Sequence, residues 1–193
     1  MTRRNRLLYY YPLLLLIFSN IDIDCAYSET KCGMEETMIL TSTAFEHNGE
    51  IPSLYTCDGQ DISPPLAWEG LPAKTKSLVL IVYDPDAPDP RAPKMTWVHW
   101  ILYNIPPDVN NLQQAVKSIE LPSGTLEGLN DWNRKGYGGP CPPIGRHRYF
   151  HKLYALDEVL PEMGTPTKPE IEKGMTGHII TAVELVETYE RTP

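Results

Sequence analysis

Residues 77–90 read SLVLIVYDPDAPDP, a continuous apolar run that ends abruptly in aspartates and prolines. The apolar part, residues 77–83, predicts a strand that is buried on both faces. The prolines end this strand, because proline has no backbone N–H to donate to a neighbouring strand. The stretch therefore predicts a buried central strand whose carboxyl end, at Asp84, opens into a rigid loop.

Further segments rich in β-branched and aromatic residues lie on both sides of this run. They cover residues 38–42, 96–105, 147–156 and 179–189, with a short helix expected at about 169–175. Strands dominate, and the connections between them are long and rich in glycine and proline. We therefore expect a mainly β fold, an antiparallel β-sandwich with Greek-key links and few peripheral helices.

The first 28 residues have the pattern of a signal peptide. Three arginines among the first six residues precede an apolar core over residues 7–18, and residues 26–28 form a small-x-small cleavage site. The core is shorter than the roughly 20 residues of a membrane span, although an uncleaved membrane anchor is the alternative. The predicted organisation is a signal peptide over 1–28, an N-terminal linker over 29–37 and one domain over 38–193. An exported protein, periplasmic or secreted, is expected.

The charge of the chain excludes several classes of partner. The net charge is −8, and removal of the first 28 residues, which hold three arginines and two aspartates, changes it to −9. Nucleic acid and anionic membrane surfaces would repel such a body. Any anion that binds must therefore be captured locally, by a few well-placed donors.

Five polar and aromatic residues at the strand ends suggest a small pocket. Side chains alternate along a strand, so Trp97 shares a face with His99, and His147 shares one with Tyr149. If these strands are neighbours, two imidazoles and a phenol converge near Asp84, whose carboxylate can fix the tautomer of one histidine. Such a pocket suits a phosphate, a sulfate or a carboxylate. Each residue also has a purely structural interpretation, as turn or core.

A metal site is not expected, because the sequence has no close His-x-His or Cys-x-x-Cys pair. The cysteines that follow the signal peptide are Cys32, Cys57 and Cys141, and their spacings match no zinc pattern. A Cys57–Cys141 disulfide is the favoured pairing, because both residues lie in turn-rich segments that flank the candidate pocket. Three unpaired thiols are the alternative.

Three motifs in this order and spacing carry a specific resemblance: DPDAP from residue 84, WVHW from residue 97 and GPCPPIGRHRY from residue 139. They resemble the signatures of the phosphatidylethanolamine-binding protein family, in its bacterial and archaeal YbhB/YbcL branch, often labelled Raf-kinase-inhibitor-like. The resemblance covers residues 38–191 and implies a large central sheet packed on a smaller one, with an anion pocket at one edge. The family's pocket positions fall on Asp84, Asp86, Pro88, Trp97, His99, Gly139, Pro140, His147 and Tyr149.

The resemblance also implies a role for several of these residues. The two histidines would donate to the anion, Asp84 would orient one imidazole, Tyr149 would add a hydroxyl donor, and the Gly139 region would supply a backbone N–H. The sequence departs from the family at Val98, where animal members often carry a histidine, and at His151, where many relatives have an aromatic residue. Four residues beyond His147 on the same face, His151 is expected to belong to packing or to a rim. The C-terminal helix of animal members is also missing.

The leading functional hypothesis is a binding protein for a small anion, phosphate-like or phosphoethanolamine-like, without a cofactor and without committed catalysis. The first alternative is a protein-interaction role, such as inhibition of an extracytoplasmic protease. The second is a hydrolase that uses histidine and aspartate as acid and base. Against the hydrolase, no serine or cysteine nucleophile is placed convincingly beside a histidine, and Cys141 is interpreted as structural.

Overall fold

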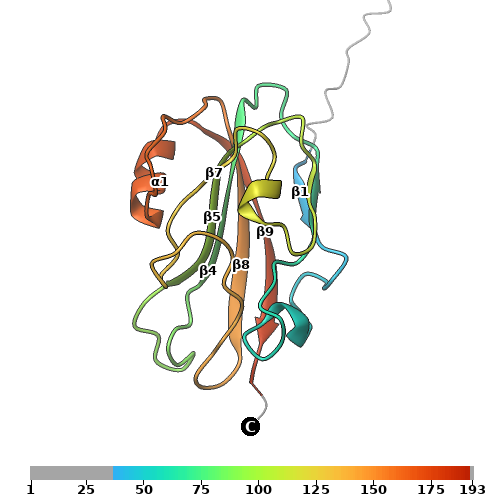
Figure 1. Ribbon diagram of the computed structural model, residues 1–193, viewed down its shortest axis with the longest axis vertical. Helices are drawn as coiled ribbons and strands as arrows, with labels where there is room; N and C mark the ends of the chain where they lie inside the picture. The colour runs from blue at the N-terminus through green and yellow to red at the C-terminus, as the bar shows by residue number, and fades with distance from the viewer. Residues whose placement is uncertain (1–36, 192–193) are drawn as a thin grey trace, which may run out of the picture. The chain divides into compact units, whose positions relative to one another are not determined.

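The computed structural model describes residues 37–191 (Figure 1). The expected signal peptide over 1–28 and all but the last residue of the expected linker lie outside this range, so both stay predictions. Within the described part, no helix is long and apolar enough to cross a bilayer.

Among residues 37–191, nine strands form two sheets and helices are few. The strands are β1 (Ile39–Thr41), β2 (Gly49–Glu50), β3 (Leu66–Glu69), β4 (Ser77–Asp84), β5 (Trp97–Ile105), β6 (Asn111–Leu112), β7 (Leu126–Glu127), β8 (His147–Leu156) and β9 (Ile179–Tyr189). The helix α1 covers Lys168–Met175, and two 3-10 turns cover Ser53–Tyr55 and Ser118–Glu120. The large sheet has the order β2-β9-β8-β4-β5-β7 and the small sheet the order β1-β3-β6, and among the strands of the described range only the β2–β9 pair is parallel. The predicted mainly β class is confirmed.

The strand over 77–83 lies in the interior of the large sheet, between β8 and β5, as its apolar run predicted. Leu78, Leu80 and Val82 pack into the core between the two sheets. Val79 and Ile81 point the other way, into a second cluster that α1 covers. Figure 1 shows α1 and β1 on opposite sides of the large sheet. A strand that is covered on both faces has a continuous apolar sequence, because the side chains on neither face are exposed to solvent.

One irregularity in β5 bears directly on the site. Val82 pairs with Trp100 and Tyr83 pairs with Val98, so His99 is one extra residue in β5 opposite β4. Such a β-bulge bends the strand locally and re-aims side chains. As a result His99 turns toward the end of the sheet, while Trp100 fills the core between the sheets.

Candidate functional site

A cavity of about 310 Å³ opens where β4 ends and where β5 and β8 begin. The antiparallel register brings these ends together, because Asp84 pairs with Trp97 across β4 and β5. The polar members of the wall are Asp84, His99 and His147. Apolar and sulfur-containing side chains form the rest of the lining: Ala87, Pro88, Met95, Trp97, Trp132, Cys141, Pro142 and Pro143.

Asp84 and His147 form a buried pair on the inner wall. The Nδ1 atom of His147 lies 2.7 Å from a carboxylate oxygen of Asp84, and its Nε2 atom lies 3.0 Å from the Ile144 carbonyl oxygen. The other Asp84 oxygen accepts the Asp86 N–H at 2.7 Å. Burial raises the pKa of Asp84, and the hydrogen bond with His147 works against that shift. Asp84 thus orients His147, but both ring nitrogens are engaged, so this histidine donates to a ligand only by giving up a bond.

His99 was expected to donate to an anion, and its surroundings in the structure give its free ring nitrogen another role. Its Nδ1 atom lies 2.6 Å from the Gly138 carbonyl oxygen and donates to it. Burial lowers the pKa of His99 to about 4, although the Gly138 carbonyl favours the charged form. Near neutral pH the ring is therefore neutral, and Nε2 carries a lone pair. This nitrogen accepts a hydrogen bond from a ligand and has no proton to donate to a bare anion.

Tyr149 packs behind the two histidines rather than lining the cavity. Its ring meets His99 edge-on with centroids 5.2 Å apart and stacks on His147 at 6.4 Å. The hydroxyl is buried and has no hydrogen-bond partner among the described residues. Burial raises the pKa of Tyr149, so the hydroxyl keeps its proton and remains a donor.

Asp86 lies outside the cavity wall and has a structural role. Its carboxylate accepts hydrogen bonds from the backbone N–H, Nε and Nη2 of Arg148 at 2.9, 2.9 and 2.7 Å. These bonds lower the pKa of Asp86 and keep the carboxylate charged. The position that the resemblance assigned to ligand binding therefore ties the loop after β4 to β8.

Gly139 and Pro140 are also used within the protein. The Gly139 N–H donates to Asp61 at 2.6 Å, so it is not free for an anion. The Pro140 carbonyl accepts the Cys57 N–H at 3.1 Å. A β-carbon at Gly139 would lie 2.3 Å from the Tyr55 carbonyl oxygen, which explains why glycine stands there. Both residues fix the cavity wall rather than line the cavity.

Cys57 and Cys141, the pair favoured from the sequence, form a disulfide in the structure with an S–S distance of 2.11 Å. It joins the loop around residues 53–61 to the loop that carries Pro142 and Pro143. Only Cys141 of the two lines the cavity. Because its sulfur is bonded to Cys57, Cys141 holds no free thiol.

Trp132 is the principal site residue that the sequence analysis missed. Its ring meets Trp97 and His99 edge-on, with centroids 5.4 and 5.1 Å apart. The side chain of Asn130 holds the turn by accepting the Trp132 and Arg134 N–H groups. The available signal was a lone tryptophan in the long, glycine-rich connection that precedes residue 147.

His151 belongs to packing and not to a rim. It is fully buried beside Glu187, which is also fully buried, with 3.3 Å between the Nε2 and Oε1 atoms. This contact lacks hydrogen-bond geometry, and neither side chain has a hydrogen-bond partner among the described residues. Burial raises the pKa of Glu187, and the nearby His151 opposes that shift.

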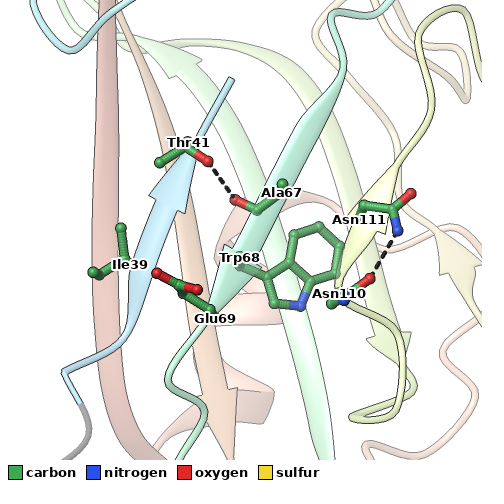
Figure 2. A pocket seen from close by; sticks show the side chains of 7 residues that line it. All are labelled: Ile39, Thr41, Ala67, Trp68, Glu69, Asn110 and Asn111. Carbon is green, nitrogen blue, oxygen red and sulfur yellow. Dashed lines mark hydrogen bonds between the residues drawn. The ribbon is translucent and has the colours of Figure 1, made fainter. Parts of the chain in front are cut away.

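A second hollow of about 390 Å³ lies on the small sheet and holds none of the expected site residues. Figure 2 shows its lining: Ile39, Thr41, Ala67, Trp68, Glu69, Asn110 and Asn111. The Trp68 indole is buried and donates its N–H to the Val109 carbonyl, so it offers no face for stacking. No group of three or more potential metal ligands occurs among residues 37–191. The cavity at Asp84 is therefore the candidate site.

The structure is thus a mainly β domain of two sheets, with a small, partly polar cavity at the end of the large sheet. Such a cavity is typical of domains that bind small ligands. Residues 41–190 match the model of the phosphatidylethanolamine-binding protein family. The chain belongs to this family, in a branch with bacterial and archaeal members.

Several relatives match over their whole length. A UPF0098 protein of Methanothermobacter thermautotrophicus is 47% identical over 80% of this chain and 99% of its own. The structure of CT736 from Chlamydia trachomatis, described as a homologue of phosphatidylethanolamine-binding protein, is 43% identical with a TM-score of 0.75 over 81% and 99% of the two chains. YbcL of Escherichia coli is 30% identical with a TM-score of 0.73 over 80% and 99%.

Proposed function

We propose that this protein binds a small anionic ligand, a phosphate or a phosphate monoester, in the cavity at Asp84 and does not act on it chemically. The observation that carries this proposal is the concentration of hydrogen-bonding groups at one end of an otherwise apolar cavity. Asp84, His99 and His147 line it, and the unpartnered Tyr149 hydroxyl lies behind them. The disulfide removes Cys141 as a nucleophile, which supports a binding role over hydrolysis.

The neutral state of His99 defines which anion fits best. A ligand with an O–H group can donate a hydrogen bond to Nε2, whereas a fully deprotonated anion meets a lone pair there. Monohydrogen phosphate and singly protonated phosphate monoesters have such a group near neutral pH, and sulfate does not. The chemistry therefore favours phosphate-type ligands over sulfate.

Phosphate is expected to raise the melting temperature of the protein, because a ligand that binds only the folded state stabilises it. At a concentration of about 100 times Kd the gain is about 2.7 kcal/mol. His99→Ala and His147→Ala should each remove most of this gain, which differential scanning fluorimetry measures directly. His178→Ala is the matched control, because His178 lies on the surface against Asp157 and Glu158. Equal stabilisation of all variants by phosphate would reject the site.

Sulfate is expected to bind more tightly as the pH falls, because its capture requires the proton that His99 lacks at neutral pH. Above the His99 pKa of about 4, the sulfate affinity should change about tenfold for each pH unit. Isothermal titration calorimetry from pH 5 to pH 7 measures this slope, and His99→Ala should flatten it. A wild-type affinity for sulfate that is independent of pH would contradict the assignment of a neutral His99.

A protein-interaction role is the second candidate, and one observation favours it. Met95 and Trp132 line the cavity, and Ile144 lies in the adjacent loop. The exposed fractions of these three residues are 48%, 39% and 52%, which is high for large apolar residues. Exposed apolar side chains that gather around a pocket mark contact surfaces more often than scattered ones do. A protease as the partner stays a proposal. Export of the protein also stays a proposal, and its support is the N-terminal sequence pattern alone.

A further inference from the structure

One loop holds both pocket histidines in place through its backbone. The Gly138 carbonyl accepts the Nδ1–H of His99 at 2.6 Å, and the Ile144 carbonyl lies 3.0 Å from Nε2 of His147. Cys141 lies midway between these two carbonyls in the chain. The tautomers and orientations of both histidines therefore depend on where this loop lies.

The second half of this loop is attached at Cys141 by the disulfide and at Arg146 by exposed ion pairs with Glu50 and Glu190. Residues 138–140 are anchored to the loop around 55–61 by the Gly139–Asp61 and Cys57–Pro140 hydrogen bonds. Among the described residues, no backbone–backbone hydrogen bond outside the strands involves residues 141–146. Two of these residues are prolines, which have no N–H to offer. The disulfide at Cys141 and the ion pairs of Arg146 are thus the restraints at the two ends of the segment that presents the Ile144 carbonyl, and only the first is covalent.

The disulfide is also accessible to a reductant. Cys57 and Cys141 are both exposed, and Cys141 contributes to the cavity wall. The bond links residues 84 positions apart, and breaking it leaves the two loops joined by hydrogen bonds at residues 139 and 140 without a covalent link. A reductant can therefore reach a disulfide that forms part of the wall of the candidate cavity.

We propose that the Cys57–Cys141 disulfide is a thiol–disulfide exchange site that controls the affinity of the adjacent pocket, with high affinity in the oxidised form and low affinity in the reduced form. The co-reactant is a dithiol. One of its thiolates attacks a sulfur of the disulfide and forms a mixed disulfide, and the displaced cysteine thiolate takes up a proton. The second thiol of the reagent then releases the other cysteine, so that two protein thiols form and the reagent leaves as its own disulfide.

Reduction acts on the ligand through the loop. Once Cys141 is free, residues 141–144 sample further conformations, and a ligand must select the one that presents the Ile144 carbonyl to His147. This selection lowers the apparent affinity by the fraction of molecules that are competent to bind. The loss of ligand affinity on reduction rests on the proposed function. The altered surroundings of the His99 and His147 rings on reduction do not depend on it.

The test compares phosphate binding to the oxidised protein and to the protein reduced with dithiothreitol. Calorimetry should show roughly tenfold weaker binding after reduction, which is the penalty for fixing the backbone of about one residue. The double variant Cys57→Ser/Cys141→Ser should bind like the reduced protein, without any reductant. Cys32→Ser is the control and should keep the full redox response. Far-UV circular dichroism establishes that each reduced sample is folded.

Two further measurements decide the matter if the double variant does not fold or phosphate does not bind. The ¹⁵N resonances of the His99 and His147 rings should shift on reduction of the native protein, without any ligand. By linkage, saturating phosphate should also raise the dithiothreitol concentration needed for half-reduction by the same factor as the loss of affinity. If the oxidised protein does not bind phosphate, the proposed function fails, and the ring resonances still test the exchange site. Unchanged ring resonances and equal affinities in both redox states would overturn the redox proposal alone.

Discussion

Replacing His151 alone with leucine is expected to lower the free energy of unfolding by about 3–5 kcal/mol at pH 7. The substitution leaves Glu187 fully buried with no partner, and a buried carboxyl without a partner costs far more than a surface one. Urea denaturation measures the loss. A loss below about 1 kcal/mol would mean that Glu187 finds other partners.

The double variant His151→Leu/Glu187→Met is the matched comparison. Both polar groups are then gone and the volumes are similar, so the stability should return to the wild-type value or exceed it by up to about 4 kcal/mol. The two single variants and the double variant complete a double-mutant cycle that isolates the energy of the pair. The double variant should be the most stable of the three.

The free energy of unfolding of the His151→Leu variant should depend on pH in one direction. Burial raises the pKa of Glu187 above its unfolded value, so the folded state binds the proton more tightly. Stability therefore falls as the pH rises from the unfolded glutamate pKa of about 4.3 toward the higher folded pKa. The penalty for His151→Leu should be largest at neutral pH and smallest near pH 4.

Asp84→Ala is the second large effect, expected to lower the free energy of unfolding by about 3 kcal/mol. It leaves the Nδ1–H of His147 and the Asp86 N–H without acceptors inside a mostly buried site. Asp84→Asn should cost only about 1 kcal/mol. The amide oxygen can accept the Asp86 N–H, and the amide N–H₂ can donate to Nδ1 of a neutral His147 that keeps its bond to Ile144.

These two Asp84 variants also differ in spectroscopy. In Asp84→Asn the ¹⁵N resonances of the His147 ring should differ from those of wild type, because the partner of Nδ1 changes from a carboxylate oxygen to an amide N–H₂ group. Equal stabilities for the alanine and asparagine variants would show that the hydrogen bonds at Asp84 contribute little. Equal ring resonances in wild type and Asp84→Asn would contradict the pairing.

The long strands could be predicted because the burial of each one produces a pattern of apolar residues within its own segment. The run over 77–83 is apolar at nearly every position since both faces of β4 are covered. The short strands β2, β6 and β7 have two residues each and carry no periodic pattern of their own. Their pairing depends on neighbours far along the chain, so the sequence could not place them.

The candidate site was predictable as a location and less so in its chemistry. Asp84, His99 and His147 meet at one cavity because strand ends and alternation are local properties. The roles of Asp86 and Gly139 changed because their partners, Arg148 and Asp61, are 62 and 78 residues away. Likewise the neutral state of His99 follows from its burial and from a carbonyl 39 residues away, which no motif encodes.

The order of the strands in the large sheet sets a condition on biosynthesis. The strand β9 comes last of the nine along the chain, yet it lies between β2 and β8. Until β9 leaves the ribosome, β8 presents an open edge and β2 has nothing to pair with. The nascent chain therefore spends its synthesis with unpaired strands, a state prone to association with other chains. Folding of this domain is expected to be largely post-translational.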